Sequence, residues 1–266
     1  MTKLKINDLT ILLVEPSGTQ RKIIVNNLAE AGVEKVDSVA NGRQAIEYLN
    51  ISEPDLVISS LYYEDMTALE LLHHIRDTEQ SQTIPFMLVS SEVKFGKLDP
   101  IKQAGVVAIL PKPFDFNALE TALKNTLHFL EPDELDLANY DATILRVLVV
   151  DDSALARKFI IKTLSGLGVQ NYTQADDGKT AIEILDGNQD FDLIVSDYNM
   201  PEVDGKAFVQ YVRNNELIAH IPVLMVTSEQ SRAVLNNIEQ VGVSAICDKP
   251  FEPDNVKQLL ASIMSE

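Results

Sequence analysis

The chain has 266 residues, which is long enough for two domains of ordinary size, and its hydrophobic content of 45% lets each half bury a core. The formal net charge is −18, with a net charge of −5 in residues 1–130, −5 in 131–145 and −8 in 146–266, so neither half offers the basic surface that nucleic acid or an anionic membrane requires. A transmembrane segment of ~20 apolar residues and a signal peptide are both lacking, and the single Cys247 cannot form an internal disulfide, so we expect a cytoplasmic protein.

The chain contains the same domain-sized sequence twice. IPFMLVSSE at 84–92 matches IPVLMVTSE at 221–229, and PKPF at 111–114 matches DKPF at 248–251, in both cases 137 residues further along. Two copies of this size indicate a tandem duplication of one domain, since a solenoid needs more and shorter repeats.

Each copy alternates short apolar runs with segments of helical periodicity. In the second copy the runs that resemble buried strands are VLVV (147–150), FDLIVS (191–196), IPVLMV (221–226) and VSAIC (243–247). After the first run, the pattern predicts a helix that begins at the N-cap Ser153 and ends at Gly166 or Gly168. Five such strand–helix units predict an α/β fold of two tandem doubly wound (βα)5 domains, each with a five-stranded parallel sheet.

An acidic connector separates the two copies. Residues 131–145, EPDELDLANYDATIL, hold acidic but no basic residues and begin with Glu-Pro-Asp, which favours an exposed linker. Three apolar side chains indicate that part of it lies against a domain, namely Leu135, Leu137 and Tyr140. We therefore expect one domain at 1–130, the linker at 131–145 and a second domain at 146–266.

In a doubly wound sheet the functional crevice lies outside the C-terminal ends of the strands. In the second copy these ends carry three carboxylates, a hydroxyl and an ammonium: Asp151, Asp152, Asp197, Thr227 and Lys249. Three neighbouring carboxylates raise one another's pKa unless a cation joins them, and oxygen ligands of this kind suit Mg²⁺. A nucleophile, a metal ion, a cation and a hydroxyl donor are together what phosphoryl transfer needs.

With these residues in this order, residues 146–266 resemble a CheY-like receiver domain of the two-component response regulators over their whole length. The resemblance implies the flavodoxin-like strand order 2-1-3-4-5 and a phosphohistidine donor, either a histidine kinase or a histidine phosphotransfer protein. It implies that Asp197 attacks the phosphoryl group to give an aspartyl-phosphate. It also implies that Mg²⁺ is held by Asp152, Asp197 and the backbone carbonyl of Asn199, with Asp151 acting through water.

The same resemblance assigns the signalling step. Lys249 would bind the phosphoryl oxygens, and Thr227 would move to hydrogen-bond the same group and draw its loop along. Asn199 and Glu229 stand at the positions that tune dephosphorylation and are similar to those of fast chemotaxis-type receivers, so we expect a short-lived phosphoryl state. Ile246 departs from the family, because the aromatic switch residue would fall there.

Residues 1–130 resemble the same fold with the chemistry removed. The residues at the corresponding strand ends are Glu15, Pro16, Ser60, Ser90 and Lys112. We expect that Ser60 has no neighbouring base to activate it and that a metal ion would lose at least two carboxylate ligands. Phosphoryl transfer should therefore fail in this copy.

Lys112 and the histidines have simpler alternatives. Lys112 is either a leftover lysine satisfied by Glu15 or backbone carbonyls, or half of a fixed ion pair with Glu15 that mimics one signalling state. His73, His74 and His128 fall in helical segments without metal-like spacing, which favours surface or packing roles. His128 also lies in the last helix of a receiver fold, so we do not expect it to be a phosphotransfer histidine.

The helical pattern of the second copy reaches the C-terminus, so we expect no output module and no classical enzyme. The expected function is a response regulator that acts on an unknown downstream protein, with 230–264 as the switching face and the first copy as a non-phosphorylatable interaction or dimerisation module. A homodimer is one option. Two alternatives stay open, a phosphate sink for a shared kinase and a phosphorylation-independent scaffold. A phosphatase of the aspartate-nucleophile type would need a DxD pattern that DDSALA lacks.

Overall fold

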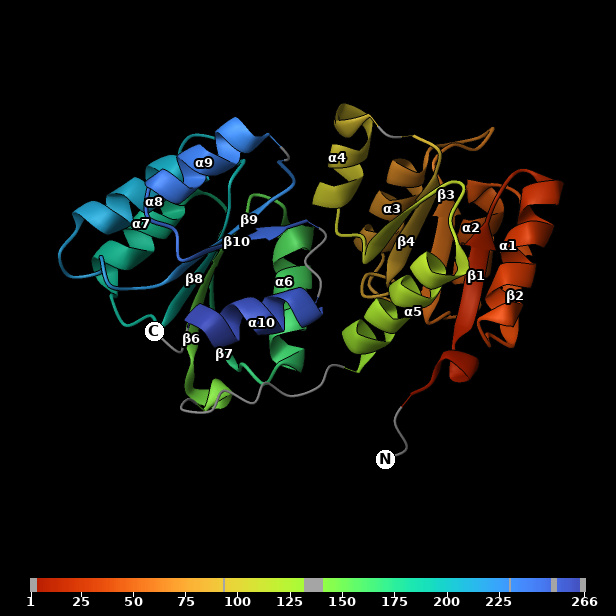
Figure 1. The fold of residues 1–266 in the computed structure, drawn as a ribbon, viewed down its shortest axis with the longest axis horizontal. Coiled ribbons are helices and arrows are strands. Elements are labelled where there is room, and N and C mark those ends of the chain that lie inside the picture. Colours follow the sequence, from red (N-terminus) through yellow and green to blue (C-terminus); the bar gives the residue numbers. More distant parts are fainter. Residues whose placement is uncertain (1–3, 93, 132–140, 230, 250–252, 264–266) are drawn as a thin grey trace. The chain divides into compact units, whose positions relative to one another are not determined.

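The computed structural model describes residues 4–92, 94–131, 141–229, 231–249 and 253–263. The chain divides after Glu131 into two compact units. Most of the expected connector, with Leu135, Leu137 and Tyr140, lies outside the described residues. Figure 1 shows that each unit is a sheet flanked by helices.

The first unit alternates strands and helices. Its strands are β1 (Thr10–Val14), β2 (Lys35–Val39), β3 (Leu56–Ser60), β4 (Phe86–Ser90) and β5 (Ala108–Pro111). The helices that follow them are α1 (Gly18–Glu30), α2 (Gly42–Leu49), α3 (Ala68–Asp77), α4 (Phe95–Gln103) and α5 (Phe116–Leu130). A short 3-10 helix, η1 (Ile6–Asp8), precedes β1.

The second unit repeats this order of elements. Its strands are β6 (Arg146–Val150), β7 (Asn171–Ala175), β8 (Leu193–Asp197), β9 (Val223–Thr227) and β10 (Ala245–Asp248). Its helices are α6 (Ala154–Gly166), α7 (Gly178–Gly187), α8 (Gly205–Asn214), α9 (Arg232–Gln240) and α10 (Pro253–Ile263). Here the 3-10 helix before the first strand is η2 (Ala142–Ile144).

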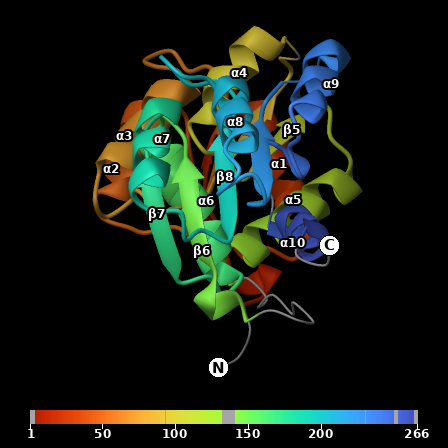
Figure 2. The same ribbon diagram turned by 90° about the vertical axis from the view of Figure 1, so that its left-hand side faces the viewer.

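Both sheets are parallel and share one strand order. The first sheet runs β2-β1-β3-β4-β5, and the second, taken from the corresponding edge, runs β7-β6-β8-β9-β10. Figure 2 shows β7, β6 and β8 side by side in the second unit. The predicted fold class is confirmed, because each unit is a doubly wound (βα)5 domain with strand order 2-1-3-4-5.

The apolar runs form the central strands of the sheets. Every residue of β3, β4, β8 and β9 is buried, whereas the edge strands β2 and β7 are largely exposed or half-buried. Since successive residues of a strand point to opposite faces, a fully buried strand must be covered on both faces. The four predicted runs of the second copy all lie in strands, although β8, β9 and β10 begin two residues later than their runs do.

The predicted ends of α6 are also found. The Ser153 hydroxyl accepts a hydrogen bond from the Ala156 backbone N–H at 3.2 Å, so Ser153 is the N-cap. The helix ends at Gly166, and Gly168 follows with φ of +100°. That left-handed conformation suits glycine, so Gly168 is the residue that turns the chain towards β7.

One arginine in each unit donates hydrogen bonds to three backbone carbonyls of neighbouring segments. Arg76 on α3 donates to the backbone carbonyls of Gln82, Ile84 and Gly105. Arg213 on α8, 137 residues later, donates to the backbone carbonyls of Ala219, Ile221 and Gly242. One guanidinium carries five N–H donors, which is enough to serve three backbone carbonyls. The duplication therefore preserved this bracing contact in both units.

The described end of the connector packs on the second unit. Ala142 and Leu145 are buried, and the Thr143 carbonyl accepts a hydrogen bond from the Asn171 side-chain amide at 2.9 Å. Residues 141–145 thus pack as part of the second unit, whereas the three apolar side chains on which the expectation for the connector rested lie outside the described residues.

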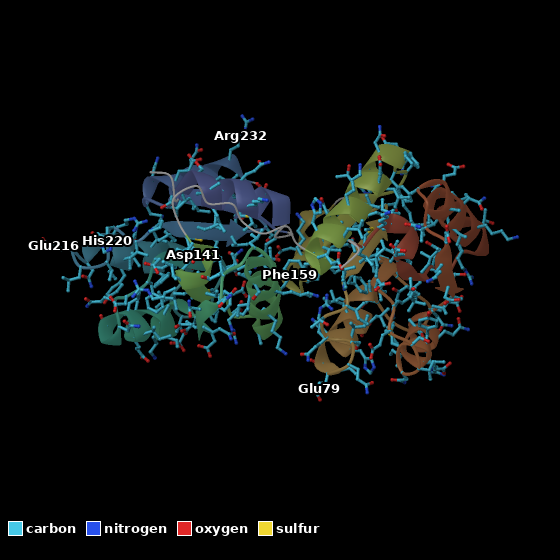
Figure 3. All side chains as sticks on the ribbon, turned by 90° about the horizontal axis from the view of Figure 1, so that it is seen from below. Glu79, Asp141, Phe159, Glu216, His220 and Arg232 are labelled. Atoms are coloured by element: carbon cyan, nitrogen blue, oxygen red, sulfur yellow. The ribbon has the colours of Figure 1, made fainter. Side chains whose placement is uncertain are left out.

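The outer surface of both units is charged. Glu79, Glu216 and Arg232 are exposed, and their side chains point away from the sheets (Figure 3). His73 and His74 are exposed on α3, and within the described parts of the chain no histidine belongs to a group with metal-ligand spacing. Across the same described residues, no helix combines the length and the apolar character needed to cross a membrane.

Candidate functional site

The residues predicted for the second rim lie at the C-terminal ends of four strands. Asp151 and Asp152 follow β6, Asp197 ends β8, Thr227 ends β9 and Lys249 follows β10. Asp197 pairs with Val226 of β9, and Thr227 pairs with Asp248 of β10, so these strand ends lie level with one another. The parallel register therefore brings together residues that are up to 98 positions apart in the chain.

The charged groups converge closely. One carboxylate oxygen from each of Asp151, Asp152 and Asp197 lies within 4.8 Å of the others. The Lys249 Nζ lies 3.1 Å from Oδ2 of Asp151 and 3.0 Å from Oδ1 of Asp197. Asp151, Asp197 and Lys249 are buried, whereas Asp152 is exposed. The structure thus assembles three carboxylates and one ammonium at a single point, as the sequence predicts.

Local hydrogen bonds fix the first of these carboxylates. The backbone N–H of Ser153 donates to Oδ1 of Asp151 at 2.9 Å, at the start of α6. The guanidinium of Arg157, one turn further along α6, donates to the backbone carbonyl of Asp151 at 2.7 Å. Asp151 is therefore held at both its side chain and its backbone, and its other oxygen faces Lys249.

Burial sets the protonation behaviour of this cluster. Burial raises the pKa of Asp197 and of Asp151, because a carboxylate loses hydration there, and the charge of Lys249 opposes the rise in both. The charge of Asp151 raises the pKa of Asp197 further. Burial lowers the pKa of Lys249, but the two aspartates outweigh it and the net pKa is raised. One charged lysine is therefore shared by two buried carboxyl groups.

The donor set fits a divalent cation. Oδ2 of Asp197 is buried and accepts no hydrogen bond from any residue in the described ranges. A buried carboxylate oxygen without a donor is costly unless a cation lies beside it. Three ionised carboxylates and one ammonium leave two negative charges unbalanced, which one Mg²⁺ would neutralise. Asp151, Asp152 and Asp197 are the residues that could hold it.

The hydroxyl at the end of β9 is held within its own loop. Oγ1 of Thr227 accepts a hydrogen bond from the Glu229 backbone N–H at 3.0 Å. In the first unit, Oγ of Ser90 accepts from the Glu92 backbone N–H at the same distance. The loop that follows this strand therefore has the same hydroxyl–backbone hydrogen bond in both units.

Two further predicted positions lie at the edge of the second rim. Asn199 is exposed on the loop that follows β8, two residues beyond Asp197. Ile246, on β10, is half-buried and packs against the apolar core of the unit. An aliphatic side chain thus fills the place where the resembled family has an aromatic ring.

Gly205 was missed by the sequence reasoning, although it contacts the predicted nucleophile. A Cβ at Gly205, the first residue of α8, would come 2.3 Å from the carbonyl oxygen of Asp197 and 2.8 Å from Cα of Tyr198. Only glycine lets the helix start this close to the strand end. The Asp204-Gly205 pair was the available signal, because such pairs mark turns and Asp204 caps α8.

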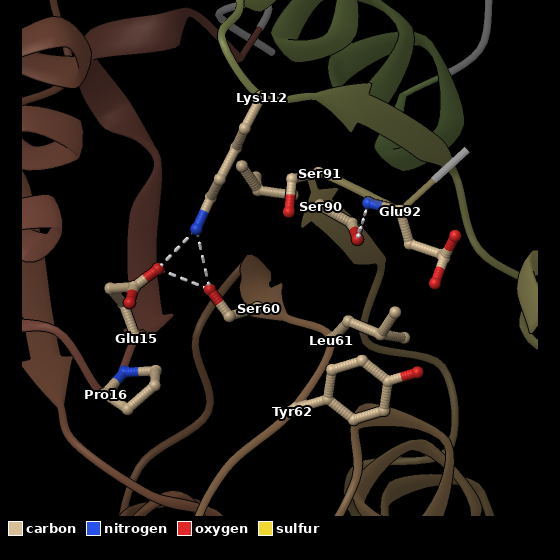
Figure 4. Close-up of a pocket in the computed structure, with 10 residues that line it drawn as sticks. Glu15, Pro16, Ser60, Leu61, Tyr62, Ser90, Ser91, Glu92 and Lys112 are labelled. Carbon is tan, nitrogen blue, oxygen red and sulfur yellow. Dashed lines mark hydrogen bonds and ion pairs between the residues drawn. The ribbon is translucent and has the colours of Figure 1, made fainter. Parts of the chain in front are cut away.

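The first rim is built differently (Figure 4). The Lys112 Nζ lies 2.6 Å from Oε2 of Glu15 and 3.1 Å from Oγ of Ser60. The Ser60 hydroxyl donates to the same Oε2 of Glu15 in a short hydrogen bond. Burial raises the pKa of Glu15, but hydrogen bonds from Lys112, Ser60 and the Ser17 N–H outweigh it, so the net pKa lies below the usual value. Glu15 is therefore an ionised carboxylate at the centre of a closed network.

This network corrects one expectation. Ser60 was expected to have no neighbouring base, yet its hydroxyl contacts the Glu15 carboxylate. Glu15 stands where Asp151 stands in the second unit but is longer by one methylene, and so its carboxylate reaches across from β1 to the end of β3. Because hydrogen bonds lower its pKa, Glu15 is a weak base.

The loop after β3 is anchored at several points that the sequence did not indicate. The Asp65 carboxylate accepts hydrogen bonds from the backbone N–H groups of Gly42 and Arg43 at the start of α2, at 3.1 and 2.8 Å. The Lys97 ammonium lies 5.7 Å from the centre of the Tyr62 ring. A carboxylate at a helix N-terminus and a cation over a ring are both stabilising. The rim of the first unit is therefore ordered, although among the described residues it holds no group of three carboxylates like that of the second unit.

Comparisons with known proteins identify the family of both units. The model of the family described as response regulator receiver domain matches residues 11–124 and again residues 147–261. Chemotaxis protein CheY1 of Helicobacter pylori is 37% identical over 120 residues, which are 45% of this chain and 97% of that protein. Chemotaxis protein CheY of Pseudomonas aeruginosa is 38% identical over 119 residues, which are 45% of this chain and 95% of that protein.

Solved structures give similar matches. The structure of chemotaxis protein CheY4 of Vibrio cholerae is 34% identical, covers 45% of this chain and 98% of its own, and has a TM-score of 0.42. The two family matches together span well over half of the chain, one in each unit. The chain therefore belongs to the response regulator receiver domain family and carries two copies of that domain in tandem.

Proposed function

We propose that this two-component response regulator accepts a phosphoryl group on Asp197 of the second unit only. The observation that carries the proposal is the contrast between two equivalent strand ends. In the second unit, Asp197 lies with two further carboxylates and Lys249, and one of its buried oxygens lacks a hydrogen-bond donor among the described residues. In the first unit the equivalent residue is Ser60, and its hydroxyl donates a hydrogen bond to the Glu15 carboxylate.

The chemistry follows from these positions. A carboxylate oxygen of Asp197 attacks the phosphorus of a phosphohistidine donor, a P–O bond forms, the P–N bond breaks and the imidazole leaves. Lys249, 3.0 Å from Asp197, pairs with a phosphoryl oxygen as negative charge moves into the rim. A bound Mg²⁺ would neutralise the remaining phosphoryl charge. Asp151, Asp152, Asp197 and the Asn199 carbonyl are the proposed ligands.

The signal starts at Thr227. Its Oγ1 accepts from the Glu229 N–H in the structure, and donation of its O–H to a phosphoryl oxygen would pull Thr227 away from that loop geometry. The loop leads directly into α9, so α9, β10 and α10 form the proposed switching surface. Because Ile246 has no ring to rotate, the change would be transmitted by movement of the loop. With Asn199 and Glu229 beside the acceptor, we expect rapid autodephosphorylation.

The first unit serves in this proposal as a non-phosphorylatable interaction or dimerisation module. It keeps the fold, the loop hydroxyl of Ser90 and the Lys112 ammonium, but it presents one carboxylate where the second unit presents three. The donor would be a histidine kinase or a histidine phosphotransfer protein in the cytoplasm, where the single buried Cys247 stays reduced. The downstream target would be a protein, because the acidic surface does not suit nucleic acid.

Intact-mass analysis after incubation with acetyl phosphate and Mg²⁺ tests the proposal. Wild type should gain one phosphoryl group, and Asp197→Asn should gain none. Two groups on wild type would contradict the proposal that the first unit is not phosphorylated, and no group would leave either a strict requirement for a protein donor or a phosphorylation-independent scaffold. Loss of the label within minutes would fit rapid turnover and a phosphate sink, whereas a label that persists for many hours would rule both out.

A further inference from the structure

A cavity of about 310 Å³ opens at the rim of the first unit. It lies among the loops that follow β1, β3 and β4, and the Lys112 side chain extends into it (Figure 4). Its wall combines hydroxyl and charged groups with the apolar surfaces of Pro16, Leu61 and Tyr62. Cavities that bind small molecules have volumes of about 300–1,000 Å³, and the wall of this one is more polar than apolar, which favours a polar ligand.

Lys112 has a hydrogen-bond donor to spare in this cavity. A lysine ammonium carries three N–H donors, and within the described residues Lys112 uses two of them, for Glu15 and Ser60. Its side chain is 23% exposed, whereas that of the equivalent Lys249 is 5% exposed. The shorter Ser60 side chain leaves room where the second unit has Asp197. The third N–H of Lys112 is therefore accessible to a ligand.

The charges around the cavity are balanced without a metal ion. Glu15 is paired with Lys112, and the second carboxylate of the wall, Glu92, lies 3.0 Å from the Lys97 ammonium. The second rim, by contrast, has two negative charges more than its lysine can balance. A small anion can therefore approach Lys112 without the cation that the second rim needs.

Hydroxyl groups add further donors. The Oγ of Ser90 accepts a hydrogen bond from the Glu92 N–H, and its own O–H can still donate. The Ser91 side chain also lines the cavity. An ammonium and two hydroxyls suit the oxygen atoms of a carboxylate or phosphate group. Hydrogen bonds to such ionised groups are stronger than hydrogen bonds between neutral groups.

We propose that this cavity binds a small organic oxyanion, a carboxylate or a phosphate monoester, without a metal ion. The anionic group binds Lys112 and the serine hydroxyls, and the apolar part of the ligand rests against Pro16, Leu61 and Tyr62. The site is independent of phosphoryl transfer to Asp197, so it goes beyond the function proposed above. With this site, the first unit would bind a small molecule although it does not accept a phosphoryl group.

Nuclear magnetic resonance titration of the full chain tests this. The chain carries Asp197→Asn and is freed of metal ions on a chelating resin, which removes the metal-dependent chemistry of the second rim without adding a soluble carboxylate. Phenyl phosphate and benzoate distinguish the two anionic groups, inorganic phosphate tests the need for an apolar part, and phenol is the neutral control. We expect saturable shifts of the Lys112 and Ser90 amides with an organic anion, at a Kd of about 1 mM or tighter, and none with phenol.

Variants separate a specific site from weak surface binding. Lys112→Gln should weaken binding by about tenfold or more, whereas the matched Lys124→Gln, at an exposed lysine paired with Glu120, should leave it unchanged. Because loss of Lys112 also disturbs the Glu15 network, Ser91→Phe provides a second variant that fills the cavity from an exposed loop. Unsaturable shifts, or shifts that survive both Lys112→Gln and Ser91→Phe, would overturn the proposal.

Discussion

The ammonium of Lys112 lies 2.6 Å from Oε2 of Glu15, and this single ion pair closes the first rim. At the second rim the corresponding ammonium of Lys249 lies between Asp151 and Asp197 and balances only one of three carboxylates. The two units therefore share one fold but differ in the balance of positive and negative charges at their rims. That difference is why we propose a bound cation at the second rim and none at the first.

The Glu15–Lys112 pair should stabilise the first unit. Lys112→Met leaves the Glu15 carboxylate buried without its cation, and we expect a loss of about 2 kcal/mol in the free energy of unfolding. The double-mutant cycle with Glu15→Gln should give a coupling energy of about 1–2 kcal/mol. Urea unfolding followed by hydrogen-exchange mass spectrometry of first-unit peptides would measure both values.

Lys124→Met is the control for that cycle. Lys124 is 56% exposed and forms an i,i+4 pair with Glu120, so its loss should change the free energy of unfolding by less than about 0.5 kcal/mol. A coupling energy near zero between Lys112 and Glu15 would support the simpler interpretation of Lys112 as a leftover lysine.

The stability of the first unit should depend on pH through Glu15. Its pKa in the folded chain is lowered from the ordinary value of 4.5, so the ionised form favours the folded state. This stabilisation is fully present above about pH 5.5 and is lost as the pH falls through 4.5 and then through the lower folded pKa. The gap in unfolding free energy between wild type and Glu15→Gln should therefore shrink on acidification. If the difference in unfolding free energy between wild type and Glu15→Gln grew between pH 6 and pH 3.5, this prediction would be wrong.

Gly205→Ala should disturb the acceptor without touching its carboxylate. The new Cβ would clash with the backbone of Asp197, so either the strand end or the start of α8 must shift. We expect slower labelling by acetyl phosphate by about tenfold or more, because misplaced reacting groups are costly, together with a lower melting temperature. Gly187→Ala, in the same unit, meets nothing within 4 Å and should leave both quantities unchanged.

Asp152 should contribute to metal affinity although it is exposed. Asp152→Asn removes one charge from the group of three carboxylates, and we expect the affinity for Mn²⁺, used as a spectroscopic substitute for Mg²⁺, to fall by about tenfold or more. Electron paramagnetic resonance of free Mn²⁺ would measure the change without any phosphoryl donor. Glu15→Gln is the matched control, since the first rim offers no such group of carboxylates in the described chain. Equal affinities in wild type and Asp152→Asn would place the ion elsewhere.

Much of the fold could be predicted because it rests on local patterns. Continuous apolar runs such as 147–150 and 221–226 indicate strands covered on both faces, and Ser153 marks the start of a helix. Parallel topology then places all C-terminal strand ends at one edge. Asp151, Asp197 and Lys249 could be grouped for that reason alone, with no knowledge of distances.

Other features depend on how far a side chain reaches in three dimensions. The sequence marks Arg76 and Arg213 only as ordinary helix residues, yet each donates to three backbone carbonyls, two of them six and eight residues away and one 29 residues away. The Asp204-Gly205 pair marks a turn, but no sequence pattern reports that a Cβ at Gly205 would come within 2.3 Å of the Asp197 carbonyl oxygen. Such contacts arise from the packing of elements against one another, which periodicity does not encode.

Strand periodicity and parallel topology were enough to predict the duplication and the set of residues at each rim, whereas the strand order came from the resemblance to a receiver domain. The contacts of Glu15 with Ser60 and Lys112, and the cavity beside them, became visible only in three dimensions. The physical reason is that one methylene more in Glu15 and a shorter side chain at position 60 change which atoms touch. Contacts on that scale are set by side-chain length and packing, whereas the fold is set by the pattern of burial.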